Sequence, residues 1–394
     1  NEQLPAGRPL KRAPAYSAMS QAGALWGESW GLEVPLMFGP EGFEETPTLK
    51  RSNAFPIVAE ECRAVREAVG LLDITGFSRY EVSGADAETW LDYLMAGRLP
   101  SAGRARLAPM LAPSGRLKGD LTLINWGDGT WWIMGSYYLR QWHMRWFNDH
   151  IGEGEQVTVR DISDDWCGFS VSGPNARKVL ASLTHQDMDA LPFMGCGMVD
   201  VGLVRARVAR MSVMGELGFE LNCRAADHIT LRETLLEAGA SHDIREVGYY
   251  AMNSLRLEKS FGIWSKEFTQ GYTSGETGMD RWIAFDKGDF IGRAAALRER
   301  DENTAPHRLV TLAVECDDAD ASGYEPVSSA DRRIGFITSG GYGHTLGRSL
   351  AMALVEPEFA APGTRLGTHI VGVACEAEVL TPSPYDPNGQ RLRM

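Results

Sequence analysis

An isolated carboxylate in an apolar segment is the first feature of the sequence that could do chemistry. Asp120 follows a turn at residues 113–115 and lies in an expected strand over residues 117–126. Side chains alternate along a strand, so Asp120 shares a face with Thr122, while Leu121 points to the other face. From this spacing, a solvated aspartate after a turn is at least as good an interpretation as a catalytic carboxylate.

Two more carboxylates lie in the motif Gly215-Glu216-Leu217-Gly218-Phe219-Glu220. Glu216 belongs to a glycine turn, where a surface carboxylate is the default interpretation. Glu220 follows two strand alternations later and fits a structural role.

Charged and aromatic residues are combined around an expected helix over residues 249–261. Arg256 and Glu258 fit either a buried structural ion pair or a contact with a ligand. Phe261 and Trp264 are three residues apart, a spacing that brings two side chains together on a helix and is more often plain core than a binding site.

Standard cofactor fingerprints are absent from the sequence. It has no Gly-x-Gly-x-x-Gly at a helix start, no Walker-type Gly-Lys-Ser/Thr, no His-Glu-x-x-His and no Gly-x-Ser-x-Gly. The six cysteines form no Cys-x-x-Cys pair and none lies beside a histidine at zinc-ligand spacing. We expect buried thiols in a reduced compartment, no metal, and any flavin or nicotinamide on another polypeptide or domain.

The composition is typical of a packed globular chain of two or three domains. With 44% apolar and 23% charged residues it fits no disordered class, and no apolar run approaches the roughly 18 residues of a spanning helix. The 39 basic and 52 acidic residues give a net charge of −13, which disfavours nucleic acid as a partner. No signal region opens the chain, so we expect a cytoplasmic protein, or one of an organelle matrix in a eukaryote.

Strands and helices are mixed without strict alternation, which predicts an α+β fold. Residues 1–50, rich in Pro and Gly, are expected to wrap a surface as an extension, and residues 51–299 to form the central domain in two subdomains. The polar stretch 300–306 is the expected linker. Beyond it, short strand patterns between Gly, Pro and Ser turns predict a small β-barrel over residues 307–394.

Two local elements are expected near the start of the central domain. The pattern over residues 60–69 is helical, with Gly70 as its stop signal. Residues 71–82 then alternate like one strand.

Four stretches together resemble the aminomethyltransferase family, that of the glycine-cleavage T-protein. They are residues 113–121, 173–176, 215–220 and 248–259. The opening residues 7–14 and the segment 261–264 are more similar to the C-terminal folate half of dimethylglycine and sarcosine dehydrogenases. The resemblance covers essentially the whole chain, and it implies a three-part cloverleaf with tetrahydrofolate in a central cavity and a C-terminal β-barrel.

The resemblance also implies roles for single residues. Asp120 matches the aspartate beside the reacting folate nitrogens, where a carboxylate can stabilise developing positive charge and accept a proton, worth roughly 10²–10⁴-fold in rate. Glu216 matches the glutamate that accepts the two-donor edge of the pterin ring with both oxygens.

The remaining candidates are folate-binding residues implied by the same resemblance. Phe261 and Trp264 match aromatic positions of the folate cavity, and Arg256 matches an arginine of the family's central helix. Tyr342 and Arg348 lie in the glycine-rich segment 340–348, near the mouth of the cavity in relatives, and could hold the anionic glutamate tail.

The implied activity is tetrahydrofolate-dependent one-carbon transfer. In the leading interpretation a flavoprotein subunit or upstream flavin domain oxidises a methylated amine such as dimethylglycine or sarcosine, and this chain captures the carbon as methylene-tetrahydrofolate. The alternative is a free-standing demethylase that takes a methyl group from a sulfonium or methylated amine and gives methyl-tetrahydrofolate. An iron–sulfur-assembly protein of the same fold is disfavoured, because residues 259–265 contain no cysteine.

Overall fold

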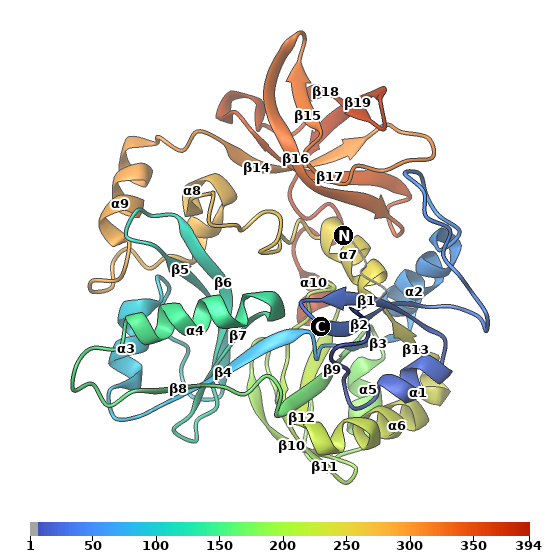
Figure 1. Cartoon of the computed structure of the whole chain (residues 1–394), viewed down its shortest axis with the longest axis vertical. Coiled ribbons are helices and arrows are strands. Elements are labelled where there is room, and N and C mark those ends of the chain that lie inside the picture. Colours follow the sequence, from blue (N-terminus) through green and yellow to red (C-terminus); the bar gives the residue numbers. More distant parts are fainter. Residues whose placement is uncertain (1–6) are drawn as a thin grey trace.

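The computed structural model describes residues 7–394, which contain four β-sheets and the helices that cover them. In Figure 1 a closed barrel lies at the top, and two lobes, each built on an open sheet, lie below it. Helices and mostly antiparallel strands are mixed along the chain, which confirms the predicted α+β class. The division at residues 50, 299 and 307 stays a prediction.

The larger open sheet has the strand order β10-β11-β12-β9-β3-β13, in which only β13 and β3 pair in parallel. Its strands are β3 (Val69–Asp73), β9 (Trp166–Ser172), β10 (Cys196–Val201), β11 (Val204–Ala209), β12 (Gly218–Arg224) and β13 (Ile244–Val247). Three helices, α1 (Tyr16–Gln21), α5 (Ala176–Ala181) and α6 (His228–Gly239), pack on one face. Phe219 and Leu221 of β12 point into this core, so the residues between them face the other way.

The second open sheet has the strand order β5-β6-β7-β4-β8. Its strands are β4 (Phe77–Ser83), β5 (Arg104–Leu111), β6 (Leu117–Asn125), β7 (Trp131–Ser136) and β8 (Thr158–Asp161). Helices α3 (Ala87–Leu94) and α4 (Arg140–Asp149) cover its outer face, where Leu121 and Leu123 of β6 join Phe147 in a buried cluster.

The uncovered faces of the two open sheets meet in a shared cluster. Ile124 and Met134 from the five-stranded sheet pack there with Cys196 and Ala209 from the six-stranded sheet. Side chains at alternate positions of β6 and β12 therefore point from opposite sides into one layer between the sheets.

The N-terminal segment packs against the centre of the molecule. It forms the hairpin β1 (Ala24–Ser29) and β2 (Leu32–Phe38), which lies in front of β3 and β9 in Figure 1. The hairpin is followed by α2 (Phe55–Glu67), which shares a core cluster with α7 (Tyr249–Glu258), for example through Val65 and Leu255.

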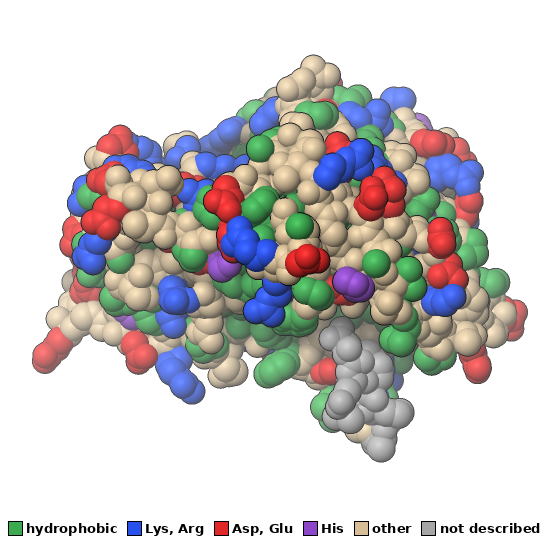
Figure 2. Space-filling view, turned by 90° about the horizontal axis from the view of Figure 1, so that it is seen from above, with side chains coloured by type: hydrophobic (Ala, Val, Ile, Leu, Met, Phe, Trp, Pro, Cys, Tyr) green, Lys and Arg blue, Asp and Glu red, His purple; other side chains and the backbone are tan. Residues whose placement is uncertain are grey.

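The C-terminal part is a closed barrel, as the sequence predicts, and its strand order is β14-β17-β16-β15-β18-β19. Its strands are β14 (Arg308–Val314), β15 (Pro326–Ser329), β16 (Arg332–Gly343), β17 (Arg348–Val355), β18 (Arg365–Ile370) and β19 (Val373–Leu380), preceded by α8 (Ser274–Thr277) and α9 (Arg293–Glu302) and followed by α10 (Gln390–Arg393). Figure 2 looks down on this end of the molecule, where acidic and basic side chains are interspersed. Within the described residues, no helix combines the length and apolarity needed to cross a membrane.

Two local predictions are wrong. The expected strand over 71–82 is two strands, because Asp73 accepts a hydrogen bond from the Thr75 amide (2.7 Å) and turns the chain between β3 and β4. Gly70 does not stop a helix but lies inside β3, where a Cβ would come within 2.4 Å of the Val65 side chain. The linker over 300–306 stays a prediction; its first residues form the exposed last turn of α9, which is followed by Asn303 in the left-handed region.

Gly248 offers a test of how the hairpin docks on the rest of the molecule. A Cβ on Gly248 would lie 2.1 Å from the carbonyl oxygen of Leu36, so Gly248→Ala must push β2 away from the start of α7. We expect a loss of about 1–3 kcal/mol in the free energy of unfolding, measured by chemical denaturation. Gly288→Ala is the control, because nothing lies within 4 Å of a Cβ there; equal denaturation midpoints for the two variants would contradict this packing.

Candidate active site

Asp120 lies on the face of β6 that is turned toward the six-stranded sheet. The β6–β7 register pairs Thr122 with Met134, a member of the cluster between the sheets, and Asp120 is two residues from Thr122 on the same face. Burial raises the pKa of Asp120 to about 7, and the negative charge of Glu267 acts in the same direction. A carboxyl group that titrates near neutrality is suited to general acid–base work.

Glu220 lies on the opposite side of this layer and is the functional candidate that the sequence interpretation left out. On β12 it pairs with Ala209 of β11, which packs in the cluster between the sheets. Its side chain is 7% exposed, and within residues 7–394 no hydrogen bond or ion pair satisfies its carboxylate. Burial raises its pKa to about 7, an effect that the positive charge of Arg79 opposes. The alternation of Phe219, Glu220 and Leu221 was the available signal, but it does not say which face a ligand would use.

Polar side chains surround Glu220 in the layer between the sheets. The fully buried Arg79 donates through Nε to Oδ1 of Asn222 (2.7 Å) and to the carbonyl oxygens of Phe77 and Ile74 (2.8 and 3.0 Å). The Asn222 side chain is also buried, and among the described residues its Nδ2 has no acceptor. The inner face therefore holds a carboxylate without a donor and an amide without an acceptor.

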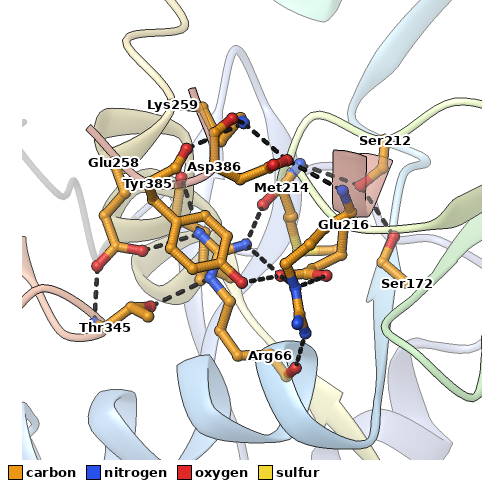
Figure 3. A network of polar contacts seen from close by, with 12 residues as sticks. Arg66, Ser172, Ser212, Met214, Glu216, Glu258, Lys259, Thr345, Tyr385 and Asp386 are labelled. Atoms are coloured by element: carbon orange, nitrogen blue, oxygen red, sulfur yellow. Dashed lines mark hydrogen bonds and ion pairs between the residues drawn. The ribbon is translucent and has the colours of Figure 1, made fainter. Parts of the chain in front are cut away.

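Glu216, the predicted pterin contact, is enclosed in a network of the chain's own side chains, drawn in Figure 3. Its carboxylate, 1% exposed, accepts from Arg66 Nη1 (3.2 Å), Tyr385 Oη (2.6 Å) and Arg391 Nε (3.0 and 2.9 Å). Tyr385 and Arg391 come from the tail that follows the barrel. Both carboxylate oxygens are thus engaged by this network.

The same network reaches α7 and the barrel. Arg66 Nη2 donates to Glu258 (2.8 Å), and Glu258 accepts from the backbone amides of Thr345 and Leu346 (2.7 and 3.1 Å) between β16 and β17. Figure 3 shows Glu216 and Glu258 on opposite sides of the Arg66 guanidinium. One arginine therefore joins two buried carboxylates from distant parts of the sequence.

Arg256 lies in a second buried ion pair. Its guanidinium contacts Glu267 (3.3 Å), Asn253 Oδ1 (3.0 and 2.8 Å) and Ser339 Oγ (2.9 Å). Glu267 in turn accepts from Thr338 and Ser339 of β16 (both 2.6 Å). These contacts attach the end of α7 to the barrel. Arg256 and Glu258 both lie in buried ion pairs, but their partners are Glu267 and Arg66 and not each other.

Of the two predicted aromatic residues, Trp264 lies beside the strand that carries Asp120. Trp264 is buried in a cluster with Leu117 and Leu139, and its ring centroid lies 5.6 Å from that of Trp142. Phe261 is half-buried, and its carbonyl oxygen accepts from Arg256 (3.1 Å).

The two predicted tail-binding residues lie on the barrel. Tyr342 lines a pocket of about 190 Å³ between α2, α7 and β16, where the Arg51 guanidinium lies 4.4 Å from its ring centroid. Arg348 is exposed and pairs with Gly343 in the β16–β17 hairpin. Among the described residues, no hydrogen bond, ion pair or ring contact joins either of them to Asp120 or Glu220.

Comparisons with known proteins agree with the fold. Residues 15–287 match the model of the GCVT N-terminal domain, and residues 307–386 match the glycine cleavage T-protein C-terminal barrel domain. The solved structure of the glycine cleavage system aminomethyltransferase T from Bartonella henselae superposes with a TM-score of 0.83 over 96% of this chain and 99% of its own, at 23% identity. That likeness shows the fold.

Relatives of two lengths match the sequence. Mitochondrial dimethylglycine dehydrogenase from Mus musculus is 31% identical over 96% of this chain but only 44% of its own length. The 4-methylaminobutanoate oxidase (formaldehyde-forming) of Paenarthrobacter nicotinovorans is 30% identical over 100% of this chain and 48% of its own, so the chain spans about half of these relatives. An aminomethyltransferase of Saccharopolyspora erythraea is 29% identical over 96% of this chain and 99% of its own. The chain therefore belongs to the aminomethyltransferase family of the glycine cleavage T-protein, a family of tetrahydrofolate-dependent transferases.

Proposed function

We propose that this chain transfers a one-carbon unit to tetrahydrofolate in the layer between its two open sheets. The observation that carries the proposal is the pair of carboxylates with raised pKa values, Asp120 and Glu220, that point into this layer from opposite sheets. Tetrahydrofolate supplies the nitrogen nucleophile to which the carbon is bonded. The chain's own residues bind it, orient it and handle the charge and the proton.

The polar groups of the layer fit a reduced pterin. The edge of a pterin ring presents an N–H beside an amino group, and a carboxylate accepts such a pair of donors with both oxygens. Glu220 is buried and has no donor of its own, and Asn222 Nδ2 lacks an acceptor among the described residues. A bound pterin would satisfy these groups, whose isolation costs free energy in its absence.

This fit moves the pterin contact from Glu216 to Glu220. Glu216 accepts hydrogen bonds from three side chains of the protein itself, and releasing it would leave the buried Arg66 with one carboxylate fewer. Breaking a buried pair costs about 3–5 kcal/mol, which a ligand contact of ordinary strength does not return. In this proposal Glu216 is structural.

Asp120 acts on the reacting nitrogen. When the amine forms its new bond, positive charge develops on nitrogen and a proton must leave, and the Asp120 carboxylate stabilises that charge and takes the proton. A pKa near 7 lets the group accept and later return a proton near neutral pH. Trp264, beside the start of β6, is proposed to border the same space, and Phe261 is kept as a proposed neighbour of it. Arg256 is proposed to hold α7 against the barrel, and Tyr342 and Arg348 lack support as tail contacts.

The carbon donor is proposed to be a methylated amine of the dimethylglycine or sarcosine type. The support is the similarity to dimethylglycine dehydrogenase and to 4-methylaminobutanoate oxidase, of which this chain spans about half. A flavoprotein subunit or domain would then supply the oxidised carbon, and methylene-tetrahydrofolate would be the product. The full-length match to a bacterial aminomethyltransferase supports a free-standing transferase or demethylase as the second candidate. The six free thiols support a reduced compartment, the cytoplasm or an organelle matrix.

Ligand binding tests the proposal directly. Tetrahydrofolate at a hundredfold excess over its Kd should stabilise the native chain by about 2.7 kcal/mol, seen as a rise in Tm by scanning calorimetry. With formaldehyde as the chemical donor, the bound chain should give methylene-tetrahydrofolate; methyl-tetrahydrofolate from a methylated sulfonium would favour the second candidate. No shift in Tm with saturating reduced folates would rule out both.

Substitution of the two glutamates separates binding from folding. Glu220→Gln places an amide donor against the donor edge of the pterin, so the affinity for tetrahydrofolate should fall by about 1–3 kcal/mol, roughly 5–150-fold, with little loss of stability. Glu216→Gln should lower the free energy of unfolding by about 3–5 kcal/mol and leave the affinity of the folded protein unchanged. Titration calorimetry and denaturation of both variants measure this. The opposite pattern would return the pterin contact to Glu216.

Asp120→Asn should lower the single-turnover transfer rate by roughly 10²–10⁴-fold while the Kd for tetrahydrofolate stays within about threefold. In the wild type the rate should rise with pH through about 7, as the carboxylate loses its proton.

The substitution Asp120→Asn should also change the stability of the native state, in a direction set by the pKa of Asp120. Because the native pKa of Asp120 lies above its unfolded value, the native state binds more protons between about pH 4 and pH 7, and the contribution of this group to stability falls as pH rises through that interval. Asp120→Asn should therefore raise Tm at pH 8. Asp149→Asn, at an exposed site, is the control and should change neither rate nor Tm. A wild-type transfer rate for Asp120→Asn would contradict the proposed role.

A further inference from the structure

Trp30 is a large aromatic residue that buries little of its side chain in the fold. It lies with Gly31 in the two-residue turn between β1 and β2, and 72% of its side chain is exposed. Both residues have positive φ values, 55° and 87°, as in a type I′ turn. Asn, Asp or Gly are the residues that such a turn favours, and a bulky side chain there is a conformational outlier.

The turn is held in place from several sides. The Lys11 amide donates to the Gly31 carbonyl oxygen, and the Glu33 amide donates to the Lys11 carbonyl oxygen (both 2.9 Å). Leu32 and Val34 of β2 share a buried cluster with Tyr137. Trp30 is therefore presented by a fixed hairpin.

The neighbour of the Trp30 ring is Tyr138. The two ring centroids are 6.0 Å apart, with the planes tilted by 53°. Tyr138 is in a short helical turn, η2 (Tyr137–Leu139), that directly follows β7, and among the described residues its hydroxyl has no hydrogen-bond partner. Two incompletely buried aromatic rings thus stand together at the end of β7.

This aromatic pair lies along the direction in which the layer continues past Asp120. The register of β6 and β7 pairs Thr122 with Met134, and continuing it places Asp120 level with Ser136 at the end of β7. The short helical turn that carries Tyr138 begins at the next residue. The charge of Asp120 also raises the pKa of Tyr138, a secondary effect after burial. A ligand that reacts beside Asp120 and continues along this direction meets these rings.

We infer that Trp30 and Tyr138 form the binding platform for the p-aminobenzoyl ring of tetrahydrofolate. The inference rests on the proposed function: N10 reacts near Asp120 and is bonded directly to that ring, which must therefore lie within a few ångströms of the carboxylate. Aromatic rings stack edge-to-face or offset at centroid distances of 4.5–7 Å, about the spacing that a third ring against Trp30 or Tyr138 would adopt. The N-terminal hairpin thereby sets specificity for the full folate over a bare reduced pterin.

Replacement by asparagine separates this role from folding. Trp30→Asn suits the turn and should keep or raise Tm, while the affinity for tetrahydrofolate should fall about threefold to tenfold. Trp30→Phe should retain most of the affinity. The matched control is Tyr324→Asn, on a barrel loop, where an aromatic residue is 78% exposed at a φ of 73°. This control should not change the affinity.

The decisive comparison uses two ligands, tetrahydrofolate and 6-methyltetrahydropterin, which lacks the p-aminobenzoylglutamate part. Titration calorimetry on the full chain should show weaker binding of Trp30→Asn to tetrahydrofolate and unchanged binding to the pterin. Equal affinity of wild type and Trp30→Asn for tetrahydrofolate would overturn the inference. It would favour a protein partner as the molecule that contacts Trp30. Equal weakening for both ligands would also overturn it, and a wild type that binds neither ligand would instead refute the proposed function.

Discussion

The buried charge cluster of Arg66, Glu216 and Glu258 is the constraint on which the rest of the site depends. A buried charge that loses its partner costs about 3–5 kcal/mol, so each of these residues requires the others. Through their contacts α2, the turn before β12 and α7 are held together, and Thr345 and Arg391 extend the cluster to the barrel and the C-terminal tail. Because β12 begins directly after this turn, the cluster also determines where Glu220 lies.

The layer between the two open sheets combines apolar packing with charge that is only partly neutralised. Asp120 and Glu220 both have raised pKa values, which means that their burial lowers the stability of the native state near neutral pH. Arg79 is the counter-charge next to Glu220, but its side-chain hydrogen bonds go to the neutral oxygens of Asn222, Phe77 and Ile74. It therefore favours the ionised form of Glu220 while the carboxylate stays free to accept donors. Buried carboxyl groups with raised pKa values are typical of functional sites.

Segments near both ends of the described chain complete the centre of the molecule. In Figure 1 the label of the C-terminus lies near the middle, close to β1 and β2. The hairpin presents Trp30 beside Tyr138, and the tail brings Tyr385 and Arg391 to Glu216. The centre of the molecule is thus bordered by elements that precede and follow the two open sheets and the barrel in the sequence.

The sequence by itself determined the α+β class, the C-terminal barrel, the family and the candidacy of Asp120, because turn residues, strand alternation and motif order are local properties. It placed β3 and β4 in one strand and left out the β1–β2 hairpin, since a side-chain turn at Asp73 and the docking of Leu36 on Gly248 are not visible in periodicity. From one motif, the resemblance assigned the pterin contact to Glu216 and left Glu220 as structural. Only the tertiary structure decided the surroundings of these two residues: Arg66 and Arg391, 150 and 175 residues away in sequence, engage Glu216, while Glu220 faces the layer between the sheets.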